Sequence, residues 1–150
     1  MRTRDAQDSG NSSDRDRRRR PPRRADLGIE AWAPTREGCV AEAVSALLDS
    51  FLSRPLPAAE SAVSFEVTGS TDAELLTAVL RHVVLRIQVL NEIPSVTKVV
   101  ATPTGLRLSC EVIDTGAVIP GGSIPKGVPR QHVRCERTRR GWWCSAKIEV

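Results

Sequence analysis

The last two residues, Glu149 and Val150, bring together two carboxylates, one on a side chain and one at the end of the chain. From Trp142 onward, apolar and polar residues alternate with the period of a β-strand. A closing strand held in a sheet would hold its terminal carboxylate as well. Oxygen ligands gathered at one point are what Ca²⁺ or Mg²⁺ requires. The alternative is an ordinary edge strand with a solvated Glu149, since carboxylates are mostly exposed.

The cysteines are a second group that could do chemistry, and they are Cys39, Cys110, Cys135 and Cys144. They form no CxxC pair and no zinc-type spacing with histidine. A two-residue loop at Arg139-Arg140 would place Cys135 directly opposite Cys144 in a hairpin. We expect two free, buried thiols there, with a cross-strand disulfide as the alternative.

Charge is distributed unevenly along the 150 residues, whose net charge is +4. Residues 1–24 hold nine Arg and four Asp, giving +5, whereas the remainder holds 13 basic and 14 acidic residues, giving −1. The first segment is predicted to be a disordered Arg-rich tail, which either binds RNA or acidic surfaces or has no dedicated partner. The nearly neutral remainder does not favour a general nucleic-acid-binding body. Without a signal peptide or an apolar run that could span a membrane, a cytoplasmic protein is expected.

Periodicity predicts an α+β fold, with a single domain over residues 25–150. Two helices are expected, one from Thr35 to about Leu52 and one from Asp72 to about Leu90. The predicted strands span residues 25–33, 62–68, 96–101, 106–113, 133–137 and 142–150. A long loop rich in Gly and Pro covers residues 114–127.

The second helix carries the strongest local signals. Thr71 to Glu74 forms a capping-box pattern, and the apolar residues that follow cover more than one face, so the helix should be largely buried. His82 lies beside that apolar surface, where a structural histidine with satisfied hydrogen bonds is favoured over a catalytic one. The sequence has no GxSxG, HExxH, Walker or Rossmann pattern. Nothing in it argues directly for an enzyme.

Three stretches, taken in order, resemble the archease family. The first, Ala25-Asp-Leu-Gly-Ile29 with Trp32, is similar to the family's opening (H)TADxGIxAxG. The second, from Glu74 through Leu90, is similar to its long central helix. The third, Gly141-Trp142 followed by Ile148-Glu149-Val150, is similar to its ending GWxxxxxxD(I/V), and Lys126 and Val128 match a KAVTYH stretch between them.

This resemblance implies an α+β sandwich and a non-catalytic accessory role. Archeases assist an RtcB-type RNA ligase, promoting its guanylylation and turnover in tRNA splicing or RNA repair. The ligase would be a transient partner, and tRNA or broken RNA would be contacted indirectly through it. The family's divalent cation would be held here by Asp26, Glu149 and the carboxylate of Val150, with Ca²⁺ favoured and Mg²⁺ the alternative.

The chain departs from the family pattern at four places. Arg23-Arg24 precede Ala25 where the pattern has a His, and Pro129-Arg130-Gln131 replace its TYH. Arg81-His82 replace a helical NE, and Glu149 replaces the terminal Asp. A second hypothesis is therefore a diverged interaction or chaperone-like module without ligase activation. A third is a redox-responsive protein acting through Cys135 and Cys144.

Overall fold

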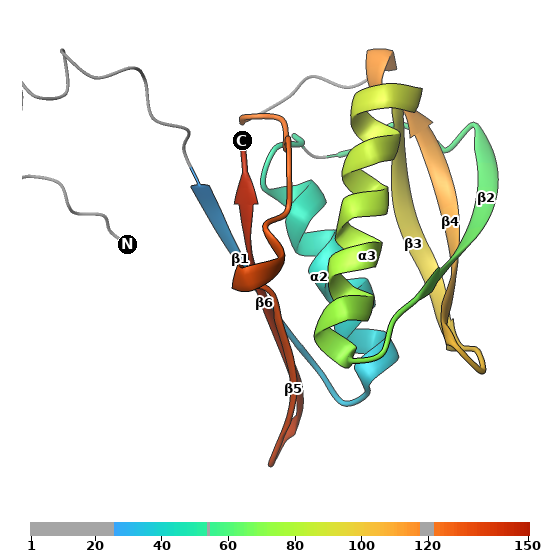
Figure 1. Ribbon diagram of the computed structural model, residues 1–150. Helices are drawn as coiled ribbons and strands as arrows, with labels where there is room; N and C mark the ends of the chain where they lie inside the picture. Colours follow the sequence, from blue (N-terminus) through green and yellow to red (C-terminus); the bar gives the residue numbers. More distant parts are fainter. Residues whose placement is uncertain (1–25, 54, 118–121) are drawn as a thin grey trace, which may run out of the picture.

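Three layers make up the fold, namely a three-stranded sheet, a pair of helices and a second three-stranded sheet (Figure 1). The computed structural model describes residues 26–53, 55–117 and 122–150. In chain order the elements are β1 (Asp26–Ala33), α2 (Arg36–Asp49), β2 (Ser61–Thr68), α3 (Asp72–Leu85), η1 (Arg86–Leu90), β3 (Glu92–Ala101), β4 (Gly105–Asp114), η2 (Thr115–Ala117), η3 (Arg130–His132), β5 (Arg134–Thr138) and β6 (Gly141–Glu149). The predicted α+β class is confirmed. The predicted tail over residues 1–24 lies outside the described residues, and the domain boundary at residue 25 stays a prediction.

The helices are sandwiched between the two sheets. The strand orders are β1-β6-β5 and β2-β4-β3, and every neighbouring pair is antiparallel. Helix α2 contacts β1 and β6 of one sheet and β3 of the other, while α3 contacts β5 and β2. The apolar stripes of both helices are therefore buried on two sides. Leu47 and Leu76 from the helices, with Leu108 and Ile148 from the sheets, are fully buried in this core.

Both predicted helix starts are confirmed by their caps. The Thr35 hydroxyl accepts a hydrogen bond from the Gly38 N–H at 3.0 Å, and the Thr71 hydroxyl accepts one from the Glu74 N–H at 3.1 Å. The Glu74 carboxylate accepts from the Ser70 N–H at 2.8 Å, one residue before the position expected in a capping box. The first turn of each helix thus has its exposed N–H groups partly satisfied by side chains.

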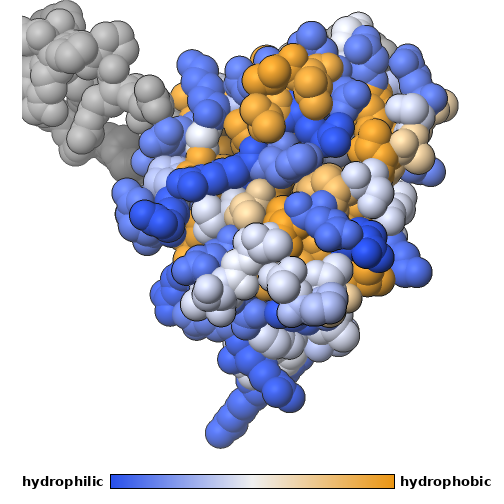
Figure 2. Space-filling model, turned by 45° about the vertical axis from the view of Figure 1, so that its right-hand side comes forward, coloured by the Kyte–Doolittle hydropathy of each residue, from blue (hydrophilic) through white to orange (hydrophobic). Residues whose placement is uncertain are grey.

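The second helix runs to Leu90 as predicted, but its last five residues form the π-helical turn η1. Leu85, Val89 and Leu90 are 51%, 63% and 51% exposed, so the prediction of a largely buried helix is wrong at this end. Ile87 continues the buried stripe into η1, whereas Leu85 lies two and a half turns after Leu76 and therefore on the opposite face of the helix. Figure 2 shows hydrophobic residues gathered at the top of the molecule, where α3 ends in Figure 1.

Strand β3 begins at Glu92, earlier than the predicted start at Val96, and it includes the buried Pro94. Because β3 is an edge strand, no neighbouring strand requires backbone N–H donors along its open side, so a proline at position 94 is tolerated. The other predicted strands match the observed ones within a residue or so. None of the helices within the described ranges is long and apolar enough to cross a membrane.

Candidate functional site

The first and last strands bring two of the predicted ligands together. β1 and β6 pair in a register that sets Asp26 opposite Glu149 and Leu27 opposite Ile148. Directly opposed residues point to the same face, with β-carbons about 4.5–5.5 Å apart. Because Ile148 is fully buried, the alternation of the strand turns Asp26 and Glu149 to the other face. Val150, the third predicted ligand, follows Glu149 directly.

The chemistry of this pair suits a hard cation. Two carboxylates directly opposite each other repel, and a bound divalent ion would remove that repulsion. Only oxygen donors are present, which favours Ca²⁺ or Mg²⁺ over zinc. Across residues 26–53, 55–117 and 122–150, no three His, Cys, Asp or Glu side chains gather as metal ligands. A site here would need further oxygen donors beside Asp26 and Glu149, and the carboxylate of Val150 and the cation both stay predictions.

Glu149 lies between Asp26 on one side and the segment 126–127 on the other. The Lys126 N–H donates to the Glu149 carbonyl at 2.6 Å, and the Glu149 N–H donates to the Gly127 carbonyl at 2.9 Å. Through these bonds Gly127 and Glu149 form an isolated antiparallel bridge, on the same side of β6 as β5. The Glu149 carboxylate packs directly over Gly127, where a β-carbon would meet it. The main chain therefore fixes the base of the side chain, and Gly127 leaves room for its tip.

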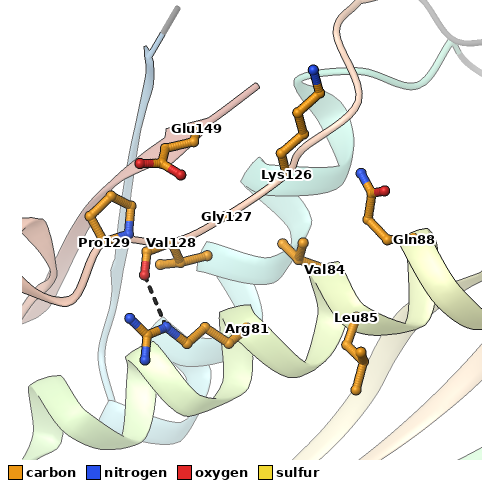
Figure 3. A pocket seen from close by; sticks show the side chains of 9 residues that line it. All are labelled: Arg81, Val84, Leu85, Gln88, Lys126, Gly127, Val128, Pro129 and Glu149. Atoms are coloured by element: carbon orange, nitrogen blue, oxygen red, sulfur yellow. Dashed lines mark hydrogen bonds between the residues drawn. The ribbon is translucent and has the colours of Figure 1, made fainter. Parts of the chain in front are cut away.

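A hollow of about 460 Å³ opens beside Glu149, between the segment 126–129 and α3. Figure 3 shows its lining residues Arg81, Val84, Leu85, Gln88, Lys126, Gly127, Val128, Pro129 and Glu149. Arg81 ties the helix to this segment, because its Nε donates to the Val128 carbonyl at 3.0 Å. The lining thus combines one carboxylate with two cationic side chains. It can receive a cation near Glu149 and an anionic group near Arg81 and Lys126.

Sequence reasoning missed this hollow. The family motif contains Lys126 but gives it no role, and Arg81 differs from the family pattern. Gly127 belongs to the predicted loop over residues 114–127. The signal available was the position of Arg81 beside the apolar stripe of α3. The partner of Arg81 is a backbone carbonyl in a distant segment, which no side-chain pattern encodes.

His82 has the structural role that was predicted. Its ring stacks on Phe65 with the centroids 3.8 Å apart, and its Nε2 accepts a hydrogen bond from the Arg86 Nε at 2.9 Å. Burial, with a smaller contribution from the charge of Arg86, lowers the pKa of His82. The neutral ring is therefore favoured, and both its face and its acceptor nitrogen are used by neighbours within the fold.

The prediction of free, buried thiols is also confirmed. All four cysteines are free and buried, and the hairpin register sets Cys135 opposite Cys144 with their sulfurs 3.3 Å apart. A hydrogen bond from its thiol to Cys135, together with burial, raises the pKa of Cys144. Burial raises the pKa of Cys110 to about 11. The hydrogen bond from Cys144 lowers the pKa of Cys135, which accepts it. Cys110 and Cys144, held in the protonated form, are poor nucleophiles and poor metal ligands.

Comparison with known proteins agrees with this architecture. The Archease protein family (MTH1598/TM1083) matches residues 20–149. Two curated relatives, each named "Probable protein archease" and from two strains of Mycobacterium tuberculosis, are 33% identical over 129 residues, covering 86% of this chain and 72% of theirs. The crystal structure of an archease from Thermotoga maritima, described as a possible chaperone, shares the fold with a TM-score of 0.58 at 13% identity, covering 87% of this chain and 94% of that one. The family match and the curated relatives together show that this chain belongs to the archease family.

Proposed function

We propose that this chain is a cytoplasmic, non-catalytic accessory protein of an RtcB-type RNA ligase. It promotes guanylylation and turnover of the ligase in tRNA splicing or RNA repair. A divalent cation, Ca²⁺ or alternatively Mg²⁺, is held by Asp26, Glu149 and the carboxylate of Val150. The observation that carries the proposal is the register that sets Asp26 opposite Glu149 in a chain of the archease family.

The surface next to the candidate cation site supports a protein partner. Leu85 lines the hollow beside Glu149, and Val89 and Leu90 continue the exposed apolar surface at the end of α3. Apolar side chains that remain exposed together mark a surface used by another protein. Lys126 and Arg81 add polar contacts at its edge, as the rim of a protein interface requires.

The RNA is held mainly by the ligase in this proposal. Residues 25–150 hold 13 basic and 14 acidic residues, so the folded part has no overall positive field to attract a polyanion. The ligase and the cation therefore account for the activity, with this chain acting on the ligase.

The test is a ligation assay with the RtcB-type ligase of the same organism, GTP and a divalent cation. Two quantities are measured: the covalent ligase–guanylate adduct and the number of ligations per ligase. The wild type should raise both. Asp26→Ala should bind the ligase without stimulating it, because the cation is lost. Leu85→Glu should lose binding, because a charge would be buried in the interface.

Lys98→Ala, an exposed change on the edge strand of the other sheet, serves as the matched control and should behave as the wild type. Stimulation by Asp26→Ala equal to that of the wild type would refute the role of the cation. Binding of the wild type without any rise in adduct or turnover would refute ligase activation. That last result would favour the chaperone-like alternative.

A further inference from the structure

Two tryptophans stand side by side on the outer face of the sheet β1-β6-β5, away from the candidate cation site. Trp32 and Trp143 are directly opposed in the register of β1 and β6. Trp32 is 62% exposed, the second most exposed large apolar residue among those described, and Trp143 is half-buried. Two indoles opposed in the register, one of them largely exposed, offer a flat aromatic surface on which another ring can stack.

The two rings are held differently. The Trp143 indole N–H donates to a carboxylate oxygen of Glu30 at 3.2 Å, and the guanidinium carbon of Arg134 lies 5.1 Å from the Trp143 ring centroid. Arg134 is in turn paired with Glu136 at 2.9 Å. Trp143 is thus fixed by its neighbours on the strands. Trp32 beside it keeps most of its surface free for a ligand.

Positive charge is concentrated next to these rings. Residues 134–140 contain four Arg and one Glu, giving +3, whereas the net charge of residues 25–150 as a whole is −1. Arg139 and Arg140 form the turn between β5 and β6, and both are exposed. With Thr138 and the two tryptophans they line a shallow hollow of about 440 Å³. An aromatic face flanked by guanidinium groups binds a nucleobase together with its phosphates.

We propose that this hollow is a contact site for single-stranded RNA. One base stacks on Trp32, a neighbouring base packs against Trp143, and Arg139 and Arg140 bind the flanking phosphates. A duplex hides the faces of its bases, so it would lose the stacking contacts. The stacking chemistry rests on the described residues alone. Only the choice of RNA over DNA rests on the proposed function, in which the contact adds weakly to the RNA binding of the ligase.

The experiment uses the full chain without any ligase, so its failure would leave the ligase proposal untouched. Because the first 24 residues would bind RNA by charge alone, all proteins carry Arg17→Gln, Arg18→Gln, Arg19→Gln and Arg20→Gln. A fluorescent 12-nucleotide RNA of mixed sequence is titrated at several salt concentrations and followed by anisotropy. Quenching of tryptophan fluorescence by unlabelled RNA is measured in parallel, and the absence of Tyr makes tryptophan the source of that signal.

Trp32→Ala should weaken binding about tenfold, as expected for loss of one stacked base, and should remove most of the quenching. Trp32→Phe keeps an aromatic face and should restore most of the affinity. Replacing both Arg139 and Arg140 by Gln should reduce the slope of log affinity against log salt by about 1.4. Ile124→Ala, which truncates an exposed apolar side chain distant in sequence from both strands, should have no effect.

Equal affinities of the parent and Trp32→Ala would overturn the proposal, as would a 12-base-pair duplex that binds as tightly as the single strand. Inorganic polyphosphate that competes as well as RNA would show that the hollow takes an acidic partner without bases, and this too would overturn it. Single-stranded DNA that binds as tightly as the RNA would support the stacking site, because the side chains of this site contact only bases and phosphates, which both nucleic acids have. Binding of DNA without binding of RNA would overturn the assignment.

Discussion

A β-carbon on Gly127 would lie 2.7 Å from Oε1 of Glu149. In the archease pattern the residue between Lys126 and Val128 is Ala, and the residue before the last is Asp. This chain therefore has a smaller residue at one position and a longer one at the other. The two departures compensate each other sterically, because the carboxylate that is one methylene longer occupies the space that a methyl group would take.

The first prediction concerns this pair. Gly127→Ala should weaken Ca²⁺ binding about tenfold, as changes to residues that orient a ligand commonly do. Glu149→Asp should also weaken it, because the shorter side chain no longer reaches over Gly127. The double variant should recover most of the affinity. Calorimetric titration of the four proteins gives the coupling energy, and strictly additive losses would show that the two positions are independent.

The second prediction tests the predicted ligands. Asp26→Ala should lower Ca²⁺ affinity by about tenfold or more, since an oxygen ligand with a full charge is removed. Two residues added after Val150 should have a similar effect, because they move the terminal carboxylate and leave every side chain in place. Calorimetry with Ca²⁺ measures both. Glu66→Ala, an exposed change on β2 of the other sheet, is the control and should bind as the wild type does.

Equal Ca²⁺ binding by the wild type, Asp26→Ala and the extended protein would refute the site. If the extended protein binds Ca²⁺ as the wild type does and Asp26→Ala does not, Val150 would be removed from the ligand set, and Asp26 and Glu149 would be kept.

The third prediction concerns pH. Burial and the charge of Arg86 lower the pKa of His82, so the folded protein binds fewer protons there than the unfolded chain does. The stability contributed by neutral His82 is therefore complete above the unfolded pKa of about 6.5 and is lost as pH falls below it. Urea unfolding between about pH 7.5 and 5.5 should show a smaller decline for His82→Gln, which keeps an acceptor for Arg86 without titrating. Parallel curves for both proteins would contradict the prediction.

The fourth prediction compares two leucines of α3. Leu76 is fully buried, so Leu76→Ala should reduce the free energy of unfolding by about 2–5 kcal/mol. Leu85 is 51% exposed, and Leu85→Ala should change it by no more than about 0.5 kcal/mol. Urea denaturation of both variants checks the difference. A large loss for Leu85→Ala would mean that the exposed end of α3 is covered in solution.

These two leucines show where sequence reasoning succeeds and where it stops. The helix containing both was predicted because its stripe, cap and length are local properties. The exposure of Leu85 was missed because apolar residues on more than one face of the helix were expected to be buried, whereas Leu85 lies two and a half turns after Leu76 and so faces the opposite side. Likewise the strands of Asp26 and Glu149 were predicted from alternation, whereas their register depends on pairing between the two ends of the chain. The hollow could not be predicted, since Arg81 reaches a backbone carbonyl.

The fifth prediction concerns the thiols. The four cysteines are free and buried, which keeps a thiol reagent away from them in the native state, and burial also raises the pKa of Cys110 to about 11. Ellman's reagent should therefore react slowly with the native protein and should titrate four thiols once it is unfolded in denaturant. Two unreactive cysteines in denaturant without reductant would show that Cys135 and Cys144 had formed a disulfide.

The pairing of the first strand with the last has a consequence for biosynthesis. The sheet β2-β4-β3 is complete in sequence by Asp114, so it can form while the ribosome is still adding the hairpin β5–β6. Among the described elements β1 is made before all the others, yet its hydrogen-bonding partner β6 is made after all the others. Pairs so distant in sequence form slowly, because a long loop must close first. Until β6 has been made, Leu27 and Ile29 therefore lack the strand that pairs with theirs, and a nascent chain stalled before β6 should bind chaperones that recognise unpaired apolar strands.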